Sequence, residues 1–115
     1  MHSFLRRLGV AAVASAGFFS AEAIAAGDAA KGKAAYVKNG CFQCHGFVGQ
    51  GGAAGKLAPN PMPYEAFANY TRTSNRAMPP YAEQILPDNE LADIYAYVES
   101  IPAPPDYKMI DLLKQ

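Results

Sequence analysis

The chain has 115 residues, 50% of them hydrophobic and 17% charged, with ten basic and ten acidic side chains and a formal net charge of zero. This balance does not favour binding to nucleic acid. The length suits one small domain, which is too small to bury a large core unaided and therefore needs an additional stabilising link.

Residues 1–26 have the pattern of a cleaved secretory signal. Arg6 and Arg7 provide a positive start, an uncharged apolar run follows over residues 8–19, and Ala23-Ile24-Ala25 forms a small-x-small cleavage site. The apolar run is too short to span a bilayer. We therefore expect export to the periplasm, removal of this segment, and no membrane span in the mature chain.

The mature chain is predicted to begin with a helix from an Asp28 cap to about Asn39, ended by Gly40 in a left-handed conformation. Cys-Phe-Gln-Cys-His follows directly, at residues 41–45, and holds both cysteines of the chain. The rarest reactive side chains of the protein are thus gathered immediately after one helix.

Four chemistries use a Cys-x-x-Cys pair. A structural zinc site needs four Cys or His ligands, and only Cys41, Cys44 and His45 are present. A thioredoxin-like pair would follow a strand, but no strand pattern lies nearby, and a disulfide between residues three apart would stabilise little. The remaining chemistry is attachment of one haem c through Cys41 and Cys44, with His45 as an axial iron ligand. A covalent haem would also supply the missing core.

This motif near the mature N-terminus, together with Ala-Met-Pro-Pro-Tyr at residues 77–81, resembles a small class I monohaem cytochrome c of the bacterial periplasm. The resemblance implies an all-α cytochrome c fold, with three to five helices around one haem. We assign this domain to residues 27–101 and a C-terminal tail to residues 102–115.

The glycine-rich segment 46–56 is predicted to be a loop that approaches the haem edge. In the cytochromes that the chain resembles, a backbone carbonyl at the end of this loop accepts a hydrogen bond from the ligand histidine and fixes its ring. The chain departs from the usual Gly-Pro-x-Leu pattern. The acceptor is therefore expected somewhere from Gly55 to Pro59.

Met78 is the predicted second axial ligand. After removal of the signal no further histidine or cysteine is left for the iron, and a thioether is the usual alternative. Pro79 and Pro80 stiffen the backbone beside Met78. Met62, at the mouth of a helix, Met109, in the tail, and water or a lysine are the alternatives.

A further helix is expected from near Pro63 to about Thr71, with Tyr64 and Phe67 against the haem pocket. Arg72 after it is expected either to neutralise a haem propionate, as basic groups do in this family, or to be solvated. A short helical turn is expected at residues 81–86.

The last helix, capped by Asp88 after Pro87, has an apolar stripe at helical spacing: Leu91, Ile94, Tyr95, Val98 and Ile101. The resemblance implies that Gly32 and Tyr36 let this helix cross the first at close range, with Tyr97 meeting Tyr36. The proline-rich tail is expected either to fold back on the domain or to dock on a partner.

These features predict a one-electron carrier rather than an enzyme, because a haem with His45 and Met78 on both faces has no open position for substrate. The expected partners are redox proteins: a periplasmic dehydrogenase, a terminal oxidase or another cytochrome. Residues 57–67, together with residues 77–81 and 91–102, resemble small cytochromes associated with dehydrogenases. This resemblance favours a dehydrogenase as electron donor, with electrons passed to the respiratory chain. The alternative is an open-site c-type haem protein, either a peroxidase or a gas-binding or sensing protein.

Charge is distributed unevenly along the mature chain. Residues 27–76 carry six basic side chains against two acidic ones, a sum of +4, and residues 77–115 carry two against seven, a sum of −5. Such an asymmetry either steers a charged partner or disappears because the two halves intermix in space.

Overall fold

The computed structural model describes residues 26–113 and contains, in this part of the chain, helices and no strands. Four α-helices are followed by two short 3-10 helices: α1 (Ala29–Lys38), α2 (Phe42–His45), α3 (Tyr64–Thr73), α4 (Asp88–Ser100), η1 (Tyr107–Met109) and η2 (Asp111–Leu113). The predicted all-α fold is confirmed. Apart from Ala26, the predicted signal of residues 1–26 lies outside the described residues.

The predicted boundaries of α1 are confirmed at both ends. The Asp28 carboxylate accepts hydrogen bonds from the backbone N–H groups of Ala30 and Lys31, at 2.9 and 3.1 Å, which caps the helix. Gly40, two residues beyond the helix, has a φ of +74°, the left-handed conformation that glycine adopts without strain. The chain therefore turns sharply just before the cysteine motif.

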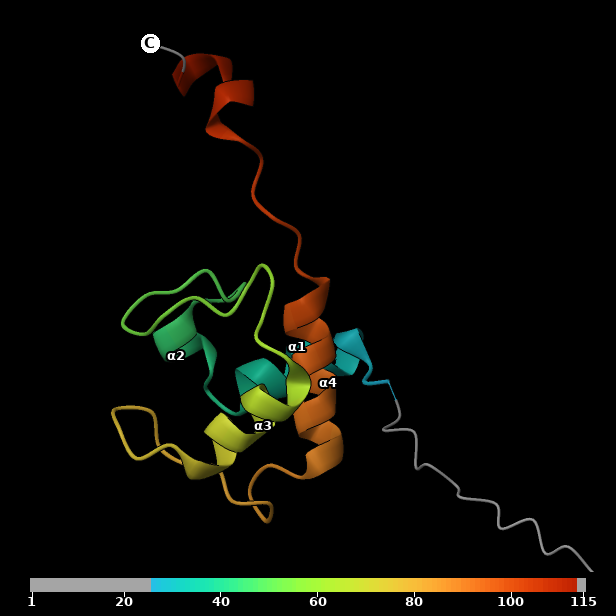
Figure 1. The fold of residues 1–115 in the computed structure, drawn as a ribbon. Helices are drawn as coiled ribbons and strands as arrows, with labels where there is room; N and C mark the ends of the chain where they lie inside the picture. Colours follow the sequence, from blue (N-terminus) through green and yellow to red (C-terminus); the bar gives the residue numbers. More distant parts are fainter. Residues whose placement is uncertain (1–25, 114–115) are drawn as a thin grey trace, which may run out of the picture.

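The crossing of α1 and α4 is the most extensive helix contact of the fold (Figure 1). At Gly32 the two backbones approach so closely that an added Cβ would lie 1.8 Å from the carbonyl oxygen of Asp93. Tyr36 and Tyr97 meet edge to face, with ring centroids 5.5 Å apart. The contact implied for Gly32, Tyr36 and Tyr97 is thus present, and Gly27 makes a second close approach that we did not anticipate.

The apolar stripe of α4 faces the core largely as predicted. Leu91, Ile94 and Val98 are buried, whereas Tyr95 and Ile101 are only partly buried. The predicted cap is wrong: Pro87 occupies the N-cap position, and Asp88 is the first residue of the helix and provides no capping bond. The Asp88 carboxylate instead pairs with Arg72.

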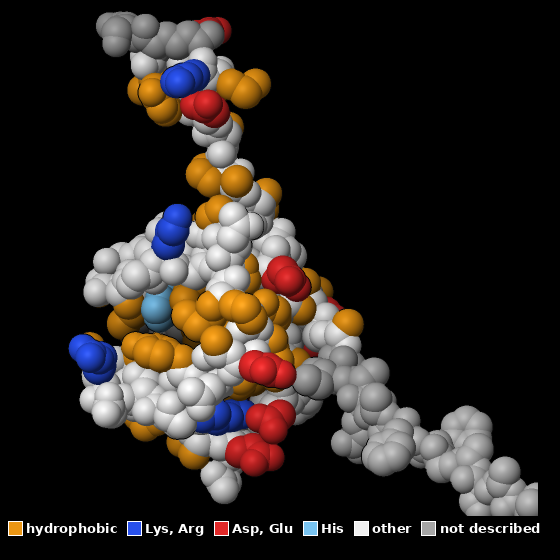
Figure 2. Space-filling model, in the orientation of Figure 1, with side chains coloured by type: hydrophobic (Ala, Val, Ile, Leu, Met, Phe, Trp, Pro, Cys, Tyr) orange, Lys and Arg blue, Asp and Glu red, His pale blue; other side chains and the backbone are white. Residues whose placement is uncertain are grey.

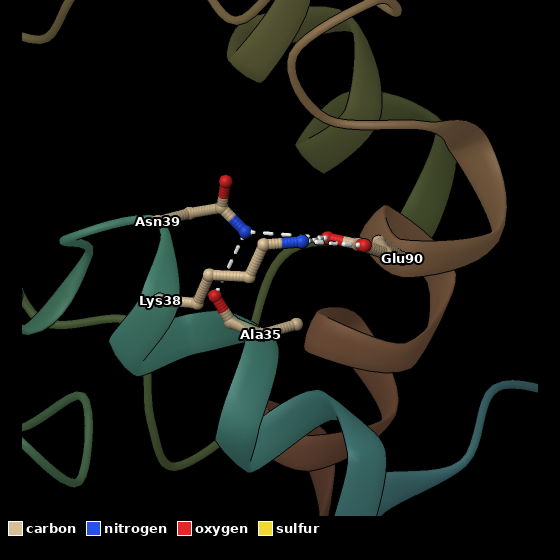
Figure 3. Close-up of polar contacts among 4 residues, drawn as sticks. All are labelled: Ala35, Lys38, Asn39 and Glu90. Atoms are coloured by element: carbon tan, nitrogen blue, oxygen red, sulfur yellow. Dashed lines mark hydrogen bonds and ion pairs between the residues drawn. The ribbon is translucent and has the colours of Figure 1, made fainter.

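A polar contact joins the end of α1 to the start of α4 (Figure 3). Lys38 Nζ lies 2.9 Å from Glu90 Oε1, and the Asn39 side-chain amide donates to the carbonyl of Ala35 at 2.9 Å and to Glu90 at 3.5 Å. The hydrogen bond from Lys38 holds the pKa of the Glu90 carboxyl below its usual value. This contact fixes the helix end from which the cysteine motif departs.

Two segments differ from their predicted form. Helix α3 continues to Thr73 rather than ending near Thr71. Residues 81–86 form a hydrogen-bonded turn instead of a helix, in which Ile85 and Leu86 both donate to the carbonyl of Ala82. The turn nevertheless buries Leu86 almost completely.

The tail leads away from the helical body (Figure 1) and does not fold back on it. All residues from 102 to 113 are exposed, with Met109 and Leu112 at 78% and 82% of their full accessibility. The structure therefore does not support the expected self-docking. Among residues 26–113, no helix is both long and apolar enough to cross a membrane.

Replacement of Gly32 by alanine is expected to lower the free energy of unfolding of the holoprotein by about 1–3 kcal/mol, because the new methyl group collides with backbone that has no room to move. Urea unfolding followed by circular dichroism measures this loss. Gly55→Ala is the matched control, since a Cβ there meets nothing within 4 Å. Equal stability of the two variants would contradict the proposed close packing.

Candidate functional site

A cavity of about 520 Å³ opens between α2 with its following loop on one side and the segment between α3 and α4 on the other. Its walls contain all four predicted site residues: Cys41, Cys44, His45 and Met78. The volume lies within the roughly 300–1,000 Å³ typical of small-molecule and cofactor sites. Figure 2 shows a histidine side chain in this opening, surrounded by hydrophobic side chains.

Helix α2 is a single turn that presents the motif to the cavity. The backbone N–H of Cys41 donates to the carbonyl of Tyr36, and that of His45 donates to Cys41. Residues three and four apart lie on the same side of a helical turn, so Cys41, Cys44 and His45 face one space. The local structure thus agrees with the arrangement of these three side chains that the motif spacing predicts.

The cysteine side chains argue against two of the alternative chemistries. Both are free thiols rather than a disulfide. Burial raises the pKa of the Cys41 thiol to about 11, whereas a thioredoxin-like cysteine needs a lowered pKa. In residues 26–113, no group of three or more His, Cys, Asp or Glu side chains is placed to hold a metal ion.

A backbone carbonyl holds the His45 ring, as the resemblance implied, and the acceptor is Gly55 rather than a proline. His45 Nδ1 lies 2.7 Å from the Gly55 carbonyl oxygen. Since a carbonyl only accepts, the ring donates from Nδ1 and keeps the lone pair of Nε2 for a metal. The structure thus identifies Gly55 as the acceptor of the His45 hydrogen bond, which the sequence had placed only within residues 55–59.

The glycine-rich loop reaches this position through backbone bonds to the motif. Gly51 donates to the carbonyl of His45 at 2.8 Å, and Ala54 donates to that of Cys44 at 2.9 Å. Gly46, Gly49 and Gly51 have positive φ values, which other residues rarely adopt. The predicted loop is confirmed, and its glycines are what allow it to fold back on α2.

Met78 is half-buried in a segment with anchors that we did not foresee. The Ser74 hydroxyl, which is buried, donates to the Met78 carbonyl at 2.8 Å. The Tyr81 hydroxyl donates to the Asn39 carbonyl at 2.8 Å. Tyr81 belongs to the Met-Pro-Pro-Tyr run, so the sequence did point to its position. No feature of the sequence around Ser74 distinguished this residue from an ordinary helix end.

Of the other methionines, Met62 also lines the cavity and is 46% exposed. Met109 lies in the exposed tail and is not part of the wall. The geometry therefore removes Met109 as an alternative, and it leaves Met62 to be tested beside Met78.

The apolar wall combines residues from three helices and one turn. Five of its members are also buried core residues: Tyr36, Phe67, Leu86, Leu91 and Ile94. Tyr64, which we expected here, packs against Tyr95 instead, with ring centroids 5.2 Å apart. The core of the domain and the wall of the cavity are thus largely the same side chains.

The expected role of Arg72 at a haem propionate is not supported. Its guanidinium binds the carbonyl of Tyr81 and the carboxylate of Asp88, and it does not line the cavity. Lys56 and Arg76 are the basic residues on the wall. Basic side chains flank the opening in Figure 2.

Residues 27–98, more than half of the chain, match the protein family described as cytochrome c oxidase, cbb3-type, subunit III. The chain belongs to this family of c-type cytochromes. No curated protein and no solved structure matches it. Haem-based electron transfer is therefore the chemistry of this cytochrome, and class I monohaem character is consistent with the match.

The residues of this cytochrome fit a covalent haem c. Two thiols and an oriented imidazole share one wall, and apolar side chains enclose a cavity of suitable volume. The haem supplies reversible one-electron chemistry at its iron. The protein supplies the attachment points, the ring orientation and the apolar enclosure.

Replacement of both Cys41 and Cys44 by alanine is expected to remove covalent haem, because these are the thiols available for thioether bonds. Haem staining of denaturing gels, compared with an antibody signal for the polypeptide, measures the loss. Each single variant should retain one thioether link. Normal covalent staining of the double variant would overturn the attachment.

Proposed function

We propose that this cytochrome is a periplasmic one-electron carrier with a single haem c, bound through Cys41 and Cys44 and ligated by His45 and Met78. The observation that carries the proposal is the single cavity onto which all four residues face. The chain has further thioether and imidazole groups only at Met1, His2, Met62 and Met109. Among the described residues of this group, only Met62 also lines the cavity.

A carrier role, rather than catalysis, is supported by the way Met78 is held. Prolines follow it directly, and Ser74 binds its carbonyl, so its backbone is constrained before any weak thioether bond forms. A ligand restrained in this way keeps the iron position closed to substrate. The competing function is an open-site peroxidase or gas sensor. It would require one coordination position of the iron to have no protein ligand.

The signal pattern of residues 1–26 and the chemistry of haem attachment support the proposed periplasmic location. A domain that uses haem as part of its core has to acquire it while the chain is still unfolded. Export of an unfolded chain followed by attachment satisfies both requirements.

The electron donor that we propose is a periplasmic dehydrogenase, and the acceptor is the respiratory chain. The proposal of a dehydrogenase rests on the resemblance of residues 57–67, 77–81 and 91–102 to dehydrogenase-associated cytochromes. The family description, which names a cytochrome c oxidase subunit, supports a terminal oxidase on the acceptor side. Electron exchange would take place at the open side of the cavity, where Lys56 and Arg76 favour an acidic partner surface.

Met78→Ala is expected to abolish the weak near-infrared band of the oxidised protein that marks an iron–methionine bond, whereas Met62→Ala should keep it. The reduction potential should fall, because a thioether stabilises ferrous iron better than the water that replaces it. The reduced variant should bind carbon monoxide, which the parent should resist at neutral pH.

Two results would contradict the proposal of a carrier whose iron has no open coordination position. Ready binding of carbon monoxide by the parent would favour the open-site alternative. Loss of the band in Met62→Ala, with retention in Met78→Ala, would transfer the ligand role to the other methionine of the cavity wall.

Arg76→Glu is expected to slow electron transfer with the native redox partner at low ionic strength, and this effect should shrink as salt screens the charges. Stopped-flow kinetics over a salt series measures it. Lys33→Glu on α1 makes the same charge change away from the cavity wall and is the control. Equal slowing by both variants would indicate an effect of net charge rather than a docking face.

A further inference from the structure

The segment that carries Met78 leaves and rejoins the same turn of helix. At its start, the backbone N–H of Ser74 donates to the carbonyl of Tyr70 at 2.9 Å, and at its end that of Tyr81 donates to Thr71 at 2.9 Å. Residues 75–80 therefore form a closed excursion from the last turn of α3. We call residues 74–81 the Met78 loop.

Arg72 lies on the same turn and binds the end of this loop. Its Nη1 donates to the carbonyl oxygen of Tyr81 at 2.8 Å, and its Nη2 lies 2.5 Å from Asp88 Oδ1. The arginine side chain is only 21% exposed, so water competes weakly for its bond to Tyr81, whereas the Asp88 carboxylate is 71% exposed. One planar guanidinium thus connects α3, the Met78 loop and the first residue of α4.

The two charges also suit the helix ends on which they lie. Arg72 is in the last turn of α3, where the helix dipole favours a cation, and Asp88 is in the first turn of α4, where it favours an anion. Helix α4 has no side-chain cap at its N-terminus. The pair therefore links the end of α3 to the start of α4, and it adds to the backbone bond that Tyr81 donates to Thr71.

We propose that Arg72 is a positioning residue for the Met78 loop, which it holds closed at Tyr81 and so keeps the Met78 sulfur at the cavity. Tyr81 extends the connection, because its hydroxyl donates to the carbonyl of Asn39, two residues before Cys41. The two sides of the cavity are thereby tied together. The inference rests on the proposed ligand role of Met78.

The test is competition by an added ligand for the iron position of the oxidised holoprotein. Imidazole, titrated while the near-infrared band is followed, should bind Arg72→Leu about tenfold more tightly than the parent, the order expected from loss of one hydrogen bond to a charged group. Arg72→Lys should lie between the two, since an ammonium replaces the charge but not the planar pair of donors.

Lys38→Leu is the matched control, because it also removes a cation paired with a first-turn carboxylate of α4 but lies outside the Met78 loop. Its thermal stability should fall with little change in imidazole affinity. If Arg72→Leu and Lys38→Leu show the same imidazole affinity, Arg72 is merely structural and the inference is overturned.

Asp88→Asn keeps the bond from Arg72 to Tyr81 and provides an answer even if Arg72→Leu fails to fold. The imidazole affinity of Asp88→Asn should exceed that of the parent, but by less than the affinity of Arg72→Lys does. If both variants bind imidazole with the affinity of the parent, the inference is refuted. A parent without the near-infrared band would instead refute Met78 ligation in the proposed function. The two failures are therefore distinguishable.

Discussion

The close crossing of α1 and α4 is the constraint on which the other parts of the structure depend. It is possible only because Gly32 places no side chain between its own backbone and the carbonyl of Asp93. The crossing directs Leu91, Ile94 and Val98 inward and buries Tyr36 fully. It also sets the position of the α1 end, from which Gly40 turns the chain into the cysteine motif. Gly32, together with the second close approach at Gly27, thus permits the helix contact that positions both the core and the site.

Hydrogen bonds hold the two irregular segments that complete the cavity beside its helical wall. On one side, the glycine-rich loop returns to α2 and brings the carbonyl of Gly55 to the His45 ring. On the other side, Ser74 and Tyr81 hold the segment of Met78. A small domain with a modest core can keep such loops in place because each is closed by backbone or side-chain bonds at both ends.

The same arrangement limits the chemistry. Apolar walls disfavour charged substrates, an oriented imidazole offers one nitrogen to iron, and a restrained methionine faces the same cavity. These properties suit haem-based electron transfer, and they support the closed iron position that we propose. Membership in a c-type cytochrome family agrees with that chemistry, and the remaining choice of partners depends on the surface around the opening rather than on its interior.

From local signals in the sequence we could predict the helical fold, the limits of α1, the apolar stripe of α4 and four residues of the cavity wall: Cys41, Cys44, His45 and Met78. Tertiary structure alone decided that Gly55 holds His45, that Arg72 binds Tyr81 and Asp88 instead of a propionate, and that Tyr64 faces Tyr95. Each of these contacts joins residues 9 to 31 positions apart in the sequence. A side chain with several polar or aromatic partners within reach takes the one that packing places beside it, and periodicity does not reveal that choice.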